Sequence, residues 1–153
     1  MAEGNGGAPL LESLAQYVKD LSFENPNAPR SLRPQDTPPN ISIQVNVNAT
    51  PLSDDEFEVE LVLEGAAGEG DGTLFRFELN FANLFRMQNI PQEHTHQVLM
   101  IECPRLMFPF ARAILANAVR DGGVPPFLLQ PIDFAQLYQA RMAEMNPPGK
   151  MNS

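Results

Sequence analysis

The residue types that could do chemistry gather in one short segment, PQEHTHQVLMIEC (91–103). It holds two histidines, His94 and His96, with Glu93 and Cys103 as possible further ligands of a metal ion. On a helix, side chains two positions apart do not face each other, and two ligands do not complete a zinc site. We therefore favour surface histidines over a metal site.

Cys103 with a histidine base such as His94 would be the minimum for nucleophilic catalysis. A free cysteine more often serves as a small apolar side chain in the core. A phosphate-binding loop is missing, because the only Gly-Lys pair is Gly149-Lys150 and the Gly-rich 65–72 segment is acidic and holds no lysine. The sequence predicts no catalytic residue, no metal and no cofactor.

Charge gives a more distinctive pattern. The chain has 153 residues and a formal net charge of −9. Residues 1–80 hold fourteen acids against four basic residues, whereas residues 81–153 hold five acids against six. Without a basic cluster that could neutralise phosphates, nucleic acid and anionic membranes are poor partners.

Features that the sequence lacks indicate the compartment in which the protein acts. Cys103 is the single cysteine, so an intrachain disulfide is impossible and a reducing compartment fits best. The N-terminal residues MAEGNGGAPLL lack the basic and apolar regions of a signal peptide, and no apolar run reaches the ~20 residues of a membrane span. We expect a cytoplasmic protein without membrane insertion.

The acids of the first half must be positioned by strands. In KDLSFE (19–24), Leu21 and Phe23 alternate with Asp20, Ser22 and Glu24, as in a strand with one buried face. That strand is predicted from about Ala15 to Phe23. Three more segments alternate in the same way: ISIQVNVNA (41–49), EFEVELVLEG (56–65) and TLFRFELNF (73–81).

The second half follows a helical period. Residues 91–103 suit a short helix from Pro91, or a strand, that Pro104 ends. A second helix is predicted with Pro109 in its first turn, Gly122 just past its end, and Phe110, Ile114, Leu115, Ala118 and Val119 as its apolar stripe. The third begins at Asp133, which forms a capping box with Gln136, and buries Phe134, Leu137, Tyr138 and Met145. Strands followed by helices predict an α+β fold: a four-stranded antiparallel sheet with helices on one face.

The polar side of this sheet has two interpretations. Its acids could serve only solubility and discourage pairing between sheet edges. Alternatively, Asp20 and Glu24 lie on a surface kept negative for a cationic partner.

The order of several motifs decides between them. YVKDLSFENPNAP (17–29), LSDDEFEVEL (52–61), TLFRFEL (73–79) and CPRLMFPFARAILANAVRDGGVPPFLLQPIDFAQLY (103–138) resemble segments of the SecB family of export chaperones of Gram-negative bacteria. The resemblance covers about residues 11–140. It implies one SecB-like domain (11–145). From their composition, the Gly-rich residues 1–10 are expected to form a mobile N-terminus and NPPGKMNS (146–153) a flexible tail.

The resemblance also implies a function. SecB proteins are homotetramers, dimers of dimers, that hold unfolded secretory preproteins without ATP and deliver them to the motor ATPase SecA. The basic tail of SecA is expected on the acidic sheet face, at Asp20, Glu24 and Glu78. Arg76, where the family often has an apolar residue, is expected to neutralise part of that face. Candidate residues of the preprotein groove are Ile41, Ile43, Val45 and Phe57. The alternatives are a small cytoplasmic enzyme using Cys103 or His94, and a structural oligomer without clients.

Overall fold

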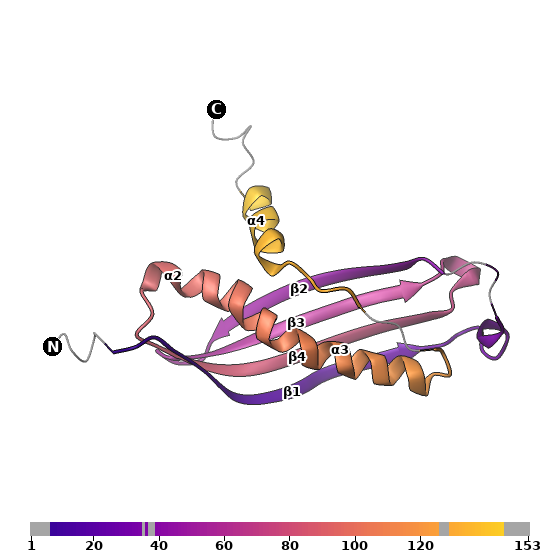
Figure 1. The fold of residues 1–153 in the computed structure, drawn as a ribbon, viewed down its shortest axis with the longest axis horizontal. Coiled ribbons are helices and arrows are strands. Elements are labelled where there is room, and N and C mark those ends of the chain that lie inside the picture. The colour runs from indigo at the N-terminus through magenta and orange to yellow at the C-terminus, as the bar shows by residue number, and fades with distance from the viewer. Residues whose placement is uncertain (1–6, 35, 37–38, 126–128, 146–153) are drawn as a thin grey trace, which may run out of the picture.

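One four-stranded antiparallel sheet forms the first layer of the fold (Figure 1). The structure, a computed structural model, describes residues 7–34, 36, 39–125 and 129–145. The strands lie in the order β1-β4-β3-β2. Their bounds are Leu10–Glu24 (β1), Ile41–Pro51 (β2), Glu56–Ala67 (β3) and Phe75–Gln88 (β4), and the short 3-10 helices are Arg30–Leu32 (η1) and Gly70–Gly72 (η2).

Alternation along the strands gives the sheet two different faces. On the face towards the helices, here called the inner face, Val59, Leu61 and Leu63 of β3 are fully buried. The opposite, outer face carries the intervening polar residues, among them Glu58, Glu60 and Glu64. The predicted sheet and the predicted sides of its strands are confirmed.

Two irregularities in β1 set which of its side chains reach the outer face. The pairing with β4 shifts between Ser13 and Ala15 and again between Val18 and Asp20. Beyond the second shift Asp20, Ser22 and Glu24 lie opposite Asn80, Glu78 and Arg76. The strand begins at Leu10, earlier than predicted, because these shifts interrupt the simple alternation on which the prediction relied.

The helical layer is longer and more continuous than predicted. Helix α2 (Gln92–Gln97) passes through a π turn, η3 (Val98–Glu102), directly into α3 (Cys103–Asp121), which crosses the inner face in Figure 1. The expectation that Pro104 ends a helix is therefore wrong. The Cys103 amide bonds to the Val98 carbonyl five residues back, and this wider turn makes room for a proline ring that has no N–H to donate.

The apolar stripe of α3 also differs from the predicted one. Met107, Ala111, Leu115 and Val119 are buried against the sheet at four-residue intervals. Phe110 is 53% exposed, and Pro109 lies inside the helix rather than in its first turn. The sequence carries apolar residues on two sides of this helix, so its pattern alone did not identify the side that packs.

Helix α4 (Phe134–Met145) stands beyond the β2 edge of the sheet in Figure 1. Asp133 caps it, since its Oδ1 accepts a hydrogen bond from the Gln136 amide at 3.0 Å. Phe134 is buried in the core, whereas Met145 is 73% exposed, so the stripe predicted for this helix packs only at its start. The termini predicted to be mobile fall largely in residues 1–6 and 146–153, outside the described residues.

Candidate binding surfaces

The carboxylates of the outer face divide into those with partners and those without. In the middle of the face, the Tyr17 hydroxyl donates to Glu58 Oε2 at 2.7 Å. Lys19 Nζ lies 3.2 Å from Glu58 Oε1 and 3.3 Å from Glu60 Oε2. The Asn80 amide donates to the same Glu60 oxygen at 2.9 Å. These carboxylates stabilise the sheet itself, because their contacts join β1 to β3 across β4.

This network changes the acidity of its members. The hydrogen bond from Tyr17, and after it the Lys19 ammonium, lower the pKa of Glu58 even though its burial acts in the opposite sense. Burial and the hydrogen bond to Glu58 raise the pKa of Tyr17 to about 12. Glu58 is therefore held as an anion and Tyr17 as a neutral phenol.

A second paired group lies at the end of the face where β1 begins. Arg86 Nη2 lies 2.9 Å from Glu56 Oε2, and the same guanidinium lies within 4 Å of Glu12 and Asp55. Gln88 also donates to Asp55, at 3.0 Å. Here too each acid has a basic or polar partner.

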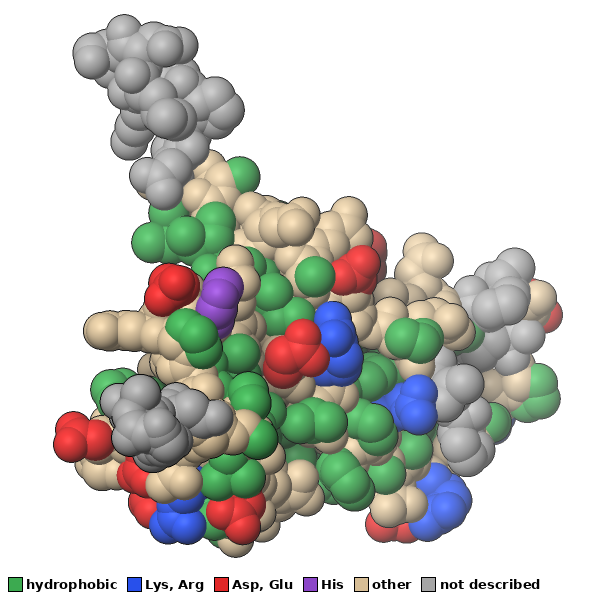
Figure 2. All heavy atoms as spheres, turned by 60° about the vertical axis from the view of Figure 1, so that its left-hand side comes forward, with side chains coloured by type: hydrophobic (Ala, Val, Ile, Leu, Met, Phe, Trp, Pro, Cys, Tyr) green, Lys and Arg blue, Asp and Glu red, His purple; other side chains and the backbone are tan. Residues whose placement is uncertain are grey.

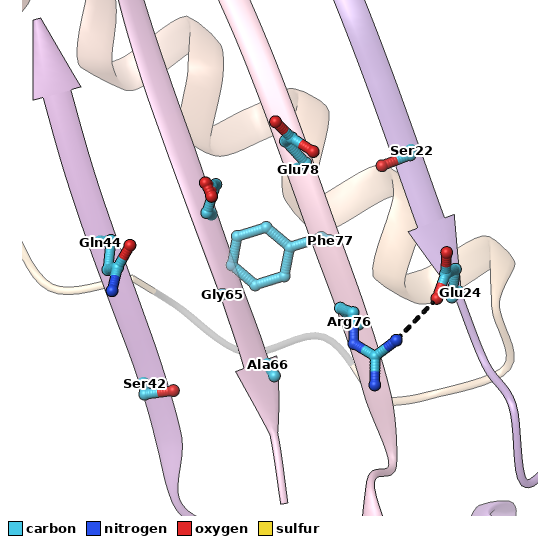
Figure 3. A pocket seen from close by; sticks show the side chains of 10 residues that line it. Ser22, Glu24, Ser42, Gln44, Gly65, Ala66, Arg76, Phe77 and Glu78 are labelled. Atoms are coloured by element: carbon cyan, nitrogen blue, oxygen red, sulfur yellow. Dashed lines mark hydrogen bonds and ion pairs between the residues drawn. The ribbon is translucent and has the colours of Figure 1, made fainter. Parts of the chain in front are cut away.

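The opposite end of the outer face is different, and we call it the acidic end: Asp20, Glu24, Glu64 and Glu78, with Arg76. Glu24, Glu64, Glu78 and Arg76 line a shallow depression of about 370 Å³ whose floor includes Gly65 and Phe77 (Figure 3). Arg76 Nη1 lies 3.0 Å from Glu24 Oε1. Within the described part of the chain, Asp20, Glu64 and Glu78 form no ion pair.

The three acids predicted to bind SecA thus share one face, and two of them line one depression. Asp20 lies on the same side of β1, two positions before Ser22, which also lines the depression. Sequence reasoning did not single out Glu64, which lies directly opposite Glu78. Only the register between β3 and β4 shows that Glu64 meets Glu78. A sequence with a long Gly-rich connection between these strands does not fix that register.

A second hollow, the β2–α2 groove, lies where the β2–β3 hairpin meets α2 and η3. Its volume is about 590 Å³. Its apolar lining is Val47, Ala49, Pro51, Phe57, Leu99 and Met100, and its polar lining is Asn48, Gln92, Thr95, His96 and Arg141. The face of the molecule turned to the viewer in Figure 2 carries a broad area of apolar side chains, with a histidine near its border.

Helix α4 is held beside this groove by the polar contacts of two of its side chains, Tyr138 and Arg141. His96 Nδ1 lies 3.0 Å from the Tyr138 hydroxyl, and the two rings are 5.4 Å apart. Arg141 donates to the Val45 carbonyl at 3.4 Å and contacts the Asn46 side chain. His96 therefore has a structural partner in α4.

The four residues predicted for a preprotein groove do not all lie together. Phe57 lines the β2–α2 groove. Val45 is half-buried against the core, and Ile41 and Ile43 lie further along the inner side of β2, 39% and 36% exposed. Leu99 and Met100 of the groove were missed because they were predicted only as part of a short helix.

The pairing needed for a cysteine-based enzyme is not present. Cys103 is fully buried, and burial followed by the nearby charge of Glu102 raises the pKa of its thiol to about 12. His94 is exposed on α2, nine residues earlier on the same run of helix, or roughly 13 Å along its axis. The thiol is protonated and away from that imidazole.

The described residues hold no group of three His, Cys, Asp or Glu side chains that could bind a metal ion. None of their helices has both the length and the apolar character that crossing a membrane requires.

The fold and these surfaces define an α+β protein with an acidic surface on one face of its sheet and an apolar groove on the other side. The family is equally clear. The chain belongs to the SecB family, since the family model described as "Preprotein translocase subunit SecB" matches residues 5–145.

Individual relatives agree with this assignment. The "Protein-export protein SecB" of Methylocella silvestris is 59% identical over 95% of this chain and 94% of its own length. That of Beijerinckia indica is 58% identical over the same shares. The fold is similar, with a TM-score of 0.61, to a SecB-like chaperone of Mycobacterium tuberculosis solved with a ChAD peptide from the HigA1 antitoxin. That match covers 80% of this chain and 90% of the other at 14% identity, and so shows the fold alone.

Proposed function

We propose that this protein is an ATP-independent holdase that keeps secretory preproteins unfolded and delivers them to SecA. The observation that carries the proposal is the separation of two unlike surfaces by one sheet. An apolar groove suits unfolded clients, and the acidic end suits a cationic partner. The export role in the names of close relatives supports it.

The client surface is the β2–α2 groove together with the exposed apolar side chains Ile41 and Ile43 of β2. An unfolded chain binds it by burying scattered apolar segments, at about 25 cal/mol per Å² before entropic costs. Met100 and Leu99 provide adaptable contacts that suit many sequences. Phe57 anchors the groove, and Val45 supports it from the core side.

The protein acts as a cytoplasmic homotetramer, a dimer of dimers. Large apolar side chains of β1 and α3 are left uncovered in the single chain: Val18, Leu21, Leu106 and Phe110 are 44%, 43%, 54% and 53% exposed. Such side chains are typical of surfaces that another subunit covers. Four linked grooves turn several weak contacts with one client into tight binding through effective concentration.

SecA docks on the acidic end, where Asp20, Glu24 and Glu78 face solvent. Release of the client then requires no nucleotide at this protein, because SecA only has to compete for the client. Catalysis has no part in this cycle.

The test combines two assays on the full-length protein. The wild type should suppress light scattering by an unfolded preprotein equally well with and without ATP. Glu78→Lys should weaken SecA binding about five- to tenfold in calorimetry, because it reverses a charge that has no partner on this surface, and should retain holdase activity.

Glu12→Lys is the matched control. It reverses a carboxylate on the same face but at the end where Arg86 lies, so SecA binding should change little. Holdase activity that depends strictly on ATP would contradict the chaperone proposal. Equal SecA affinity of wild type and Glu78→Lys would contradict the docking site, and no SecA binding at all would favour an oligomer without this partner.

A further inference from the structure

Arg76 is the one basic side chain among the residues that line the acidic depression. It lies directly opposite Glu24 on β1 and opposite Ala66 on β3. Because Ala66 offers no acceptor, the guanidinium turns towards β1, as Figure 3 shows, and pairs with Glu24 at 3.0 Å. In the unbound protein, Glu24 is therefore already occupied by a cation of its own chain.

The neighbouring acids, Glu64 and Glu78, have no basic partner among the described residues. Glu64 and Glu78 lie directly opposite each other on β3 and β4. Like charges at opposed positions of a sheet destabilise it, and no cation of the described residues lies within ion-pair distance of either. A bound cation would relieve this repulsion, whereas at Glu24 it would have to displace Arg76.

We propose that Arg76 sets the affinity and selectivity of this depression by competing with the cations of the docking partner for Glu24. The inference rests on the proposed function, since it takes a basic segment of SecA as the partner. The segment makes its first contact at Glu64 and Glu78. A second cation of the same segment then takes Glu24 from Arg76.

The strength of the Arg76–Glu24 pair suits such an exchange. The two side chains are 55% and 59% exposed, so the pair is hydrated and weak. It can be displaced, but a segment with a single positive charge gains little at Glu24. Arg76 thereby favours partners with several basic residues over chains with scattered ones.

The test is calorimetry of SecA with Arg76→Gln and with Arg86→Gln as its matched control. Both substitutions remove one positive charge from the same face of the same strand, and circular dichroism verifies the fold of each. Arg76→Gln should bind SecA about threefold more tightly at low salt, because a cation next to the site is removed. Arg86 lies ten residues along β4, roughly 34 Å away and several Debye lengths at 0.1 M salt, so Arg86→Gln should change the affinity less than about 1.5-fold.

A double-mutant cycle identifies the mechanism. Glu24→Gln should cost little affinity while Arg76 is present and about threefold more in the Arg76→Gln background, because only there is Glu24 free for the partner. Raising the salt to about 0.5 M should abolish both differences.

Four results would overturn the inference. Weaker binding by Arg76→Gln would show that Arg76 itself contacts the partner. Equal gains from Arg76→Gln and Arg86→Gln would show an effect of net charge alone. If wild type and Glu78→Lys both failed to bind SecA, the docking proposal would fail and this inference with it, whereas wild-type binding without a gain from Arg76→Gln would remove only the role of Arg76.

Discussion

At the scale of single residues, the surroundings of each outer-face carboxylate depend on what lies on the next strand. Tyr17 and Glu60 both lie opposite Ala82 of β4 in the register. This small, fully buried side chain lets Tyr17 and Lys19 reach across β4 to the glutamates of β3. At the acidic end Glu24 pairs with Arg76, but Asp20, Glu64 and Glu78 have no ion-pair partner among the described residues, and there the surface remains negative.

The Tyr17–Glu58 hydrogen bond predicts how stability depends on pH. The pKa of Tyr17 is raised from its ordinary 10.0 to about 12, so its contribution is present below pH 10 and is lost as the pH rises towards 12. Glu58, whose pKa is lowered, contributes to stability above the ordinary value of 4.5, and this contribution is lost as the pH falls through the lowered value. Urea unfolding at several pH values should show that Tyr17→Phe lowers the free energy of unfolding by about 1 kcal/mol near pH 8 and flattens the decline above pH 10.

Tyr138→Phe provides the control for this prediction. It removes the other tyrosine hydroxyl of the chain, which pairs with His96 rather than with a carboxylate. The alkaline decline should persist in this variant. An unchanged decline in Tyr17→Phe would show that another group causes it.

Sequence alternation was sufficient to place Asp20, Glu24 and Glu78 on one face. It could not show that Arg76 pairs with Glu24 or that Glu64 meets Glu78, because these contacts depend on the register between strands. The shift after Val18 decides the register of β1, and it has no signature in the local pattern of side chains.

At the scale of elements, the sheet was predictable because a period of two residues persists through β2, β3 and β4 and through the part of β1 that follows its second register shift. The helices were less predictable. Pro104 looks like the end of a helix when only its missing N–H is considered. The π turn that accommodates it depends on packing of Leu99 and Cys103 in the core, which the local sequence does not encode.

Gly65 allows β2, β3 and β4 to approach each other closely beneath the acidic end. A Cβ at this position would lie 2.5 Å from the Ser42 carbonyl oxygen and 2.6 Å from Cζ of Phe77. Gly65→Ala should therefore lower the free energy of unfolding by about 1–3 kcal/mol, because backbone and a buried ring must move. Urea denaturation monitored by circular dichroism measures this loss.

Gly72→Ala is the matched control, since a Cβ there would meet no atom within 4 Å. It should change the free energy of unfolding by less than about 0.5 kcal/mol. Equal stabilities of the two variants would mean that the strands yield easily at Gly65.

At the scale of the whole molecule, the uncovered apolar side chains predict assembly. Phe110→Glu should shift the proposed tetramer towards smaller species in native mass spectrometry at low micromolar concentration, because a charge would be buried between subunits. Leu52→Glu is the control: Leu52 is 58% exposed but lies in the turn between β2 and β3. A tetramer that withstands Phe110→Glu would place the subunit contacts elsewhere.

The β2–α2 groove belongs to this scale too, and it could not be predicted from the sequence. It brings together Phe57 of β3, Leu99 of the π turn and Arg141 of α4, which are far apart along the chain. Only Phe57 among them was a candidate, because strand alternation identified its side of the sheet.

The opposed faces of the sheet have one practical consequence. Binding at the acidic end weakens as ionic strength rises, whereas apolar contacts in the groove tolerate added sodium chloride. A salt gradient should thus detach a cationic partner while leaving an unfolded client in place. The complex with the client could then be studied without the cationic partner, and without a single substitution.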